Sequence, residues 1–168
     1  MTKVSRRVVA DGDWYLVECA VRADGVTSPV SSFLDELGEA AWAPGVGEPF
    51  DQDAQVRTRS WFLAACEQFA HTGDLPRCDY NRLRDGIWEF KHFDFRVSFF
   101  DTDGTGAYTP KLSERMPFAG GGYCPLPNFD EYIRLGHPFP KMSAKTSQTD
   151  LNTAATVRRE DLRHDIEG

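Results

Sequence analysis

Apolar positions recur along the chain with two different periods, and each period predicts its own kind of element. In residues 28–37 they lie three and four residues apart, as on the buried face of a helix. The members of this stripe are Val30, Phe33, Leu34 and Leu37. Ser28 and Pro29 stand immediately before it, and both residue types are typical of the first positions of a helix.

A second helix is predicted over residues 51–71. Phe62 and Phe69 share one face of it, and Gly73 follows where helices commonly end in the left-handed conformation. The preceding stretch, 40–50, contains two prolines and two glycines, so we expect a connector there.

Strand patterns occur in three places. Residues 14–21 (WYLVECAV) are rich in aromatic and β-branched side chains. Residues 86–101 alternate between apolar and polar positions, but the parity changes near Phe93 and Asp94, which predicts two antiparallel strands joined by a tight turn. Residues 131–139 (EYIRLGHPF) are predicted as a further strand.

The remaining sequence predicts an insertion and a final helix. Residues 102–130 contain five glycines and four prolines without any helical or strand period, so a long irregular insertion is expected. Ser147 and Asp150 have the spacing of a capping box, and an amphipathic stripe that predicts a C-terminal helix follows them. The stripe consists of Leu151, Ala154, Ala155, Arg158 and Leu162.

The order of these elements indicates the fold class. The chain has 168 residues, which suits a single domain over residues 1–168 with the insertion at about 102–130. A strand, two helices, a strand pair, another strand and a helix follow one another. That order predicts an α+β fold, in which a small antiparallel sheet carries the helices against one face.

Charge narrows the choice of partners. The formal net charge of −7 argues against a general nucleic-acid binder, because affinity for phosphate comes largely from Lys and Arg. Residues 134–159, however, contain five basic side chains against one acidic one, a local balance of +4. A local basic face on an acidic protein is therefore expected.

The lengths of the apolar runs and the spacing of the cysteines argue against a membrane, secreted or zinc-binding protein. No run approaches the roughly 18 apolar residues of a membrane span, and the first residues do not resemble a secretory leader, so we expect a cytoplasmic protein without membrane contact. The four cysteines include no closely spaced pair, which argues against structural zinc. We expect no metal, no cofactor and no disulfide.

Four short segments stand in a characteristic order. They are SPVSSFLDEL (28–37), GDL (73–75), LRDGIWEFK followed by RVSFF (83–100), and FPKMSAKTS (139–147). Together they resemble the RelE/HigB superfamily of toxins from type II toxin–antitoxin systems, nearest its HigB-like, phage-related branch. The sequence departs from that pattern at Lys91, where the pattern has Arg, and at Pro140 and Gln148, where it has basic residues.

The resemblance implies a RelE-like fold and an endoribonuclease that cuts mRNA, typically on the translating ribosome and without a metal. In such a reaction a ribose 2′-hydroxyl attacks the neighbouring phosphate, and fixed cations stabilise the negative charge that gathers on the phosphoryl oxygens. A cognate antitoxin, usually a helix-turn-helix protein, is the implied partner that covers the basic face.

The candidate site residues are mostly basic. The resemblance places Lys91 and Arg96 on the strand pair and Lys141 and Lys145 at the exit of the last strand, so we expect all four to line one concave face. Arg96 is the candidate phosphate clamp, since its planar fork can bind two oxygens at once. Lys141 and Lys145 are expected to hold the RNA backbone. A solvated sheet face is the alternative for Lys91 and Arg96.

Four further residues are candidates. His92 and His137 suit proton transfer because imidazole titrates near neutral pH. His92, however, has the parity of the neighbouring aromatic positions, which favours a half-buried structural histidine, and His137 could simply end its strand. Arg82 and Arg84 would extend the RNA track before the strand pair.

A second hypothesis belongs to a different functional class. The acidic total and the missing basic positions favour a RelE-like scaffold that has lost nuclease activity. Such a protein would act as a phage or mobile-element factor and bind a host protein through residues 102–130. The four cations at the expected site favour the nuclease.

Overall fold

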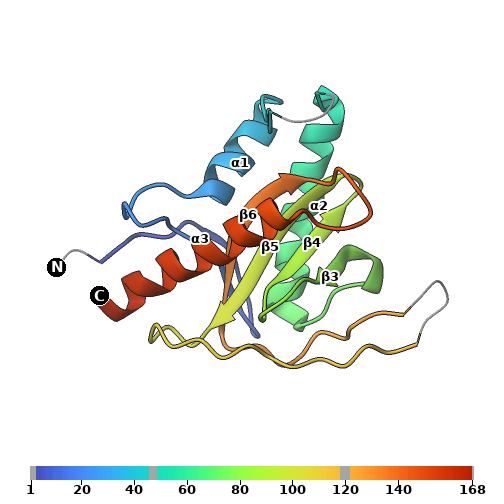
Figure 1. Ribbon diagram of the computed structural model, residues 1–168. Coiled ribbons are helices and arrows are strands. Elements are labelled where there is room, and N and C mark those ends of the chain that lie inside the picture. Colours follow the sequence, from blue (N-terminus) through green and yellow to red (C-terminus); the bar gives the residue numbers. More distant parts are fainter. Residues whose placement is uncertain (1–2, 46–48, 118–121, 168) are drawn as a thin grey trace.

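The computed structural model describes residues 3–45, 49–117 and 122–167, which form six strands and three α-helices (Figure 1). The strands are β1 (Val8–Asp11), β2 (Leu16–Cys19), β3 (Tyr80–Arg82), β4 (Trp88–His92), β5 (Phe95–Thr102) and β6 (Tyr132–Pro140). The helices are α1 (Pro29–Gly38), α2 (Gln52–Thr72) and α3 (Gln148–Glu167), and a short 3-10 turn, η1 (Arg77–Asp79), precedes β3. The α+β class expected from the sequence is confirmed.

The sheet is mixed, and the expectation of an antiparallel sheet is therefore wrong in one pairing. Its strand order is β1-β2-β6-β5-β4-β3, and β2 and β6 run parallel while the other neighbours are antiparallel. β2 and β6 lie more than 100 residues apart in the sequence. Because local patterns reveal only the pairing of consecutive strands, this parallel contact could not be read from them.

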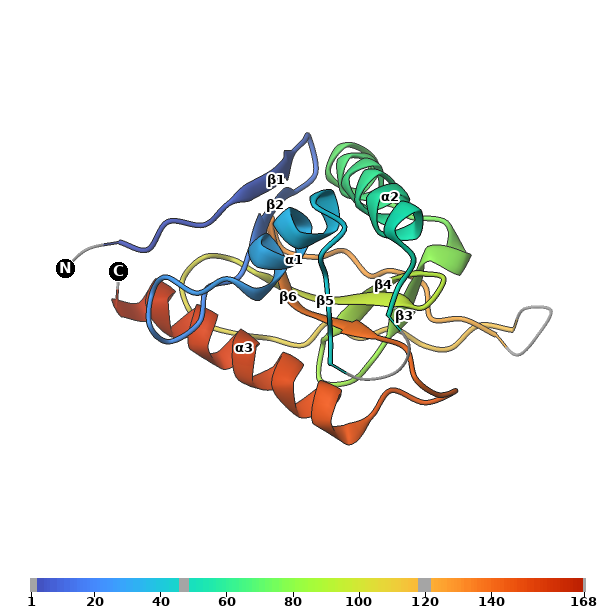
Figure 2. The same ribbon diagram turned by 90° about the horizontal axis from the view of Figure 1, so that it is seen from above.

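The helices cover both faces of the sheet rather than one. α1 and α2 pack on one face and α3 on the other (Figure 2). β5 contributes side chains to the cores on both faces of the sheet. Phe99 belongs to the larger core under α1 and α2, whereas the next residue, Phe100, packs with Val157 and Leu162 of α3. The larger core contains most of the buried aromatic rings.

Several local predictions are confirmed. α1 and α2 begin and end within one residue or so of the predicted bounds, and Gly73 ends α2 with φ = 74°. The side chain of Asp51 caps α2 by accepting a hydrogen bond from Ala54 N at 3.0 Å. Ser28 stands at the start of α1 as predicted, but its hydroxyl donates to the carbonyl of Ala20 instead of capping the helix.

Other elements differ from the prediction in extent. β1 and β3 were not predicted, because four and three residues are too few to show a period. α3 is confirmed and continues to Glu167, but its buried side includes Asp161. This carboxylate is fully buried because it pairs with Arg134 at 2.6 Å and with Arg6 at 2.9 Å. A hydrophobic pattern does not mark such a position.

The insertion leaves the sheet after β5 and returns to it at β6 (Figure 1). Its described residues are irregular, as predicted, apart from an isolated antiparallel bridge between Met116 and Tyr123. Gly120 and Gly121 of the glycine run, and residues 46–48 of the predicted connector, lie outside the described residues. All four cysteines are described as free thiols, of which Cys78 is exposed.

Candidate functional site

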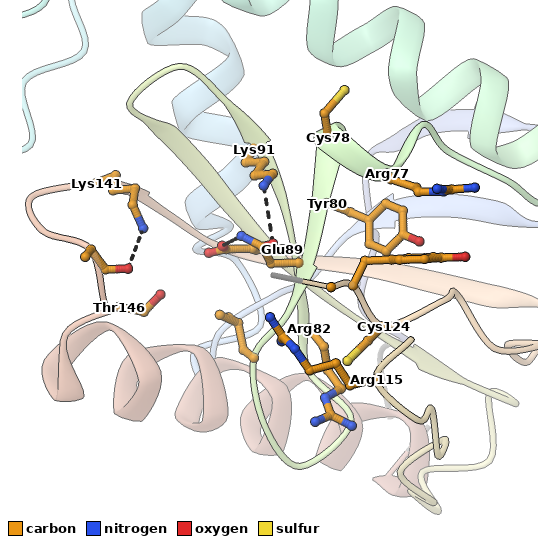
Figure 3. Close-up of a pocket in the computed structure, with 15 residues that line it drawn as sticks. Arg77, Cys78, Tyr80, Arg82, Glu89, Lys91, Arg115, Cys124, Lys141 and Thr146 are labelled. Atoms are coloured by element: carbon orange, nitrogen blue, oxygen red, sulfur yellow. Dashed lines mark hydrogen bonds between the residues drawn. The ribbon is translucent and has the colours of Figure 1, made fainter. Parts of the chain in front are cut away.

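A cleft of about 810 Å³ lies on the face of the sheet turned away from α2, beside β3 and β4 (Figure 3). We call it the basic cleft. The cations among its described lining residues are Arg77, Arg82, Lys91, Arg115 and Lys141. They come from five separate parts of the chain, namely η1, β3, β4, the insertion and the loop after β6. The described lining contains one carboxylate, Glu89, so the cleft is strongly positive although the whole chain is acidic.

Glu89 lies between these cations (Figure 3) and is only 1% exposed. Its Oε2 accepts a hydrogen bond from Asn81 Nδ2 at 3.0 Å and lies 3.6 Å from Arg96 Nε. Lys91 Nζ in turn donates to Asn81 Oδ1 at 3.3 Å. Burial raises the pKa of Glu89, against the opposing effects of Asn81 and Arg96. The carboxylate is thus closed off from solvent, and it contacts Arg96 directly and Lys91 through Asn81.

Arg96 does not present its fork to solvent, contrary to the phosphate-clamp expectation. It is 6% exposed, and its Nη1 donates to the carbonyls of Phe93 and Phe95, the latter at 2.9 Å. Burial lowers the pKa of Arg96, although Glu89 opposes this effect. Arg96 therefore binds the turn between β4 and β5 to the sheet, which is a structural task.

A second cavity, of about 470 Å³, lies beside the start of α3, and we call it the histidine cavity. In it His137 Nε2 lies 2.9 Å from Asp150 Oδ1, and the hydroxyl of Ser147 donates to the other oxygen of Asp150 at 2.8 Å. Burial lowers the pKa of His137, although the Asp150 carboxylate, which accepts a hydrogen bond from the ring, opposes this effect. His137 is therefore neutral at neutral pH and able to accept a proton.

The two cavities adjoin, since Lys141 and Thr146 line both. The loop that carries these two residues follows β6 and leads into α3. It is held by Lys141, whose backbone N–H donates to Asp94 at 2.7 Å and whose Nζ donates to the carbonyl of Ala144 at 3.2 Å. Lys141 is thus the cationic residue that lines both cavities.

The four cations expected on one concave face divide between these adjoining cavities. Lys91 and Lys141 line the basic cleft, whereas Arg96, Lys141 and Lys145 line the histidine cavity together with His137. Lys145 is exposed. The structure therefore brings the predicted residues to one region of the molecule, with Arg96 buried at the boundary.

The other predicted residues lie at different distances from this region. Arg82 lines the basic cleft and donates to the carbonyl of Ser113 at 2.7 Å. Arg84 reaches α3 instead, where it donates to Asn152 at 3.1 Å. His92 lies on the opposite face of the sheet, stacked on Trp61 of α2 with ring centroids 4.4 Å apart, as the half-buried alternative expected.

Sequence reasoning missed four residues of the site. They are Glu89, Asp150, Arg77 and Arg115. Glu89 lies two residues from the predicted Lys91 on β4, so the strand alternation could have placed its side chain on the same face. Asp150 was recognised as a capping residue, but its contact with His137 depends on how α3 meets β6. Arg77 and Arg115 lie outside the periodic segments, and no sequence signal marks them.

Comparisons with family models, curated proteins and solved structures give no match. Within the described ranges, no group of three or more His, Cys, Asp or Glu is placed to hold a metal ion. No α-helix among the described residues has both the length and the apolar character to cross a membrane.

Proposed function

We propose that the protein is an endoribonuclease that holds single-stranded RNA in the basic cleft and transfers protons in the histidine cavity. The observation that carries this proposal is the junction of the two sites. A cleft lined by five cations shares Lys141 and Thr146 with a cavity in which His137 is hydrogen-bonded to the Asp150 carboxylate. The resemblance to RelE/HigB toxins supports the same reaction class.

Binding follows from the charge of the basic cleft. Each Lys or Arg that neutralises a phosphate releases condensed counterions, so affinity is expected to fall steeply as salt is added. The side chains around Glu89 are fixed by hydrogen bonds before RNA arrives, as the chain from Lys91 through Asn81 to Glu89 shows. Fixed cations need little reorganisation when charge develops on the phosphoryl oxygens.

The reaction divides among three side chains. His137 accepts the proton of a ribose 2′-hydroxyl, the 2′-oxygen bonds to the adjacent phosphorus, and the bond from phosphorus to the 5′-oxygen breaks. Lys145 donates a proton to the leaving 5′-oxygen, and Lys141 stabilises the phosphoryl oxygens between the two cavities. The products are a 2′,3′-cyclic phosphate and a 5′-hydroxyl. Asp150 positions His137 and raises its basicity.

One observation favours the second hypothesis, a scaffold without nuclease activity that serves as a binding protein. Arg96 is buried, and one of its guanidinium nitrogens donates to two backbone carbonyls, so the expected bidentate phosphate clamp is missing from the surface. On this hypothesis the basic cleft serves only to bind an acidic partner. An antitoxin that neutralises the nuclease would cover the same cleft, and its contact surface is expected to be acidic.

Incubation of the purified protein with end-labelled single-stranded RNA in EDTA tests the proposal. Wild type is expected to cut, whereas His137→Gln and Lys145→Ala lose 10²-fold or more in rate, the usual contribution of a proton-transfer group. Arg163→Ala, an exposed position near the end of α3, serves as the control and retains full rate. Binding without cutting, in buffer and in a translating extract alike, would support the scaffold hypothesis instead.

A further inference from the structure

Phe93 is an exposed aromatic residue in an unusual backbone conformation. It lies in the turn between β4 and β5, 85% exposed, with φ = 51°. A bulky side chain rarely adopts a positive φ, and such positions gather at functional sites. The neighbouring Arg96 fixes the conformation by donating a hydrogen bond to the Phe93 carbonyl. Packing does not explain the ring, because solvent surrounds most of it.

A third cavity, of about 440 Å³, opens beside this ring, and we call it the turn pocket. Its apolar part includes Phe50, Phe95 and Met142, of which Met142 is 59% exposed. Lys141 lines the turn pocket as well as the basic cleft and the histidine cavity. Lys141 therefore joins the turn pocket to the basic cleft and to the histidine cavity.

We propose that Phe93 is a stacking platform for an unpaired base of the RNA whose backbone passes Lys141. This inference rests on the proposed function and adds a base subsite to it. Proteins that bind single-stranded RNA combine a cationic track for the backbone with aromatic faces for the bases. Here the track and the face meet at one lysine, and the turn pocket offers apolar surface from Phe50, Phe95 and Met142. Its lining also includes the charged residues Asp51, Arg57 and Asp94. Because every base has a π-face, the subsite tolerates different sequences.

The held turn explains why the ring remains outside. The carbonyls of Phe93 and Phe95 both accept hydrogen bonds from Arg96, which holds the backbone between β4 and β5 in the conformation that keeps the Phe93 ring exposed. The His92 and Phe93 rings form a T-shaped pair with centroids 4.8 Å apart, and the Phe93 residue is still 85% exposed.

The test uses a 2′-O-methyl oligonucleotide, which lacks the attacking hydroxyl and stays intact, with 2-aminopurine at successive positions. Wild type is expected to bind it and to quench the probe at one position through stacking. Phe93→Leu keeps an apolar side chain but loses the aromatic face, so binding should weaken about tenfold and the quenching should disappear. Phe93→Trp should restore both.

Two controls keep the test independent of folding. Phe93→Gly suits a positive φ, so its unfolding midpoint should equal or exceed that of wild type while it binds as weakly as the leucine variant. Val26→Ala removes an exposed apolar side chain elsewhere and should bind as wild type does. Equal binding and quenching by all Phe93 variants would overturn this subsite and leave the proposed function standing. Failure of wild type to bind the oligonucleotide would overturn both.

Discussion

Glu89 and Arg96 form a buried ion pair across β4 and β5, with Arg96 Nε 3.6 Å from Glu89 Oε2. Both side chains are more than nine-tenths buried, so neither reaches a bound substrate. The pair instead links the floor of the basic cleft to the wall of the histidine cavity. Arg96, which the sequence predicted as a phosphate ligand, therefore has a structural role between the two cavities.

Arg96→Ala should therefore lower the free energy of unfolding by about 3–5 kcal/mol, because it leaves the Glu89 charge buried without its partner. Lys145→Ala, at an exposed position, should leave the free energy of unfolding unchanged while it removes the activity. Urea unfolding of both variants separates the two roles. An Arg96→Ala protein as stable as wild type but inactive would restore Arg96 as a phosphate ligand.

Activity should fall on the acidic side as His137 becomes protonated. Its pKa lies below the ordinary 6.5 because the ring is buried, so the cleavage rate should hold at neutral pH and decline only below 6.5. The cleavage rate measured against pH under single-turnover conditions gives the midpoint of this acidic limb. A midpoint above 6.5 would contradict the assignment of His137 as the proton acceptor.

Asp150→Asn tests the carboxylate that orients His137. Asp150 raises the pKa of His137 through its hydrogen bond and charge, so the variant should move the acidic limb to lower pH. The maximum rate should fall as well, because the ring loses its orientation. A merely structural role for Asp150 would lower the rate without moving the limb.

The basic cleft predicts a specific salt dependence. Lys91→Ala and Arg82→Ala should each weaken binding of single-stranded RNA and reduce the slope of log affinity against log salt by about 0.7, the value for one phosphate contact. Fluorescence anisotropy over a salt series gives the slope. Arg163→Ala is the matched charge-removing control, and it should leave the slope as it is.

A buried ion network near the start of β6 should be sensitive to substitution for structural reasons alone. Arg134 pairs with Glu18, Asp161 and Asp165 under α3, and its side chain is 3% exposed. Arg134→Ala should cost about 3–5 kcal/mol of unfolding free energy, since Glu18 loses its cation and Asp161 and Asp165 keep only Arg6. Arg163, paired with Glu167 at the surface, should contribute close to nothing when replaced. Equal effects of the two changes would contradict the burial of this network.

The local pattern of apolar and polar residues was sufficient to predict the elements that pack against segments close in the sequence. α1, α2 and the hairpin of β4 and β5 each have a stripe or an alternation that one segment displays by itself. The parallel contact of β2 with β6, and the position of α3 on the second face, depend on distant segments. No single segment contains the information that fixes them.

In the candidate site, too, some features follow from local sequence and others only from the tertiary fold. The sequence predicted Lys91, Arg96, Lys141 and Lys145 on one concave face, with His137 as a candidate for proton transfer. The structure distributes these residues over two adjoining cavities. The sequence did not predict that Arg96 would be buried, because burial depends on Glu89 from the neighbouring strand. The cations from η1 and the insertion belong to segments without periodicity, so only the tertiary fold identifies them as part of the basic cleft.

The central claim, attack by a ribose 2′-hydroxyl in these joined cavities, is tested most directly with RNA that carries one 2′-deoxynucleotide at the main cleavage position. We expect wild type to cut the all-ribose strand in EDTA to 2′,3′-cyclic phosphate and 5′-hydroxyl ends, and to leave the substituted bond intact. Cleavage of the substituted bond, or products with 5′-phosphate ends, would contradict the account.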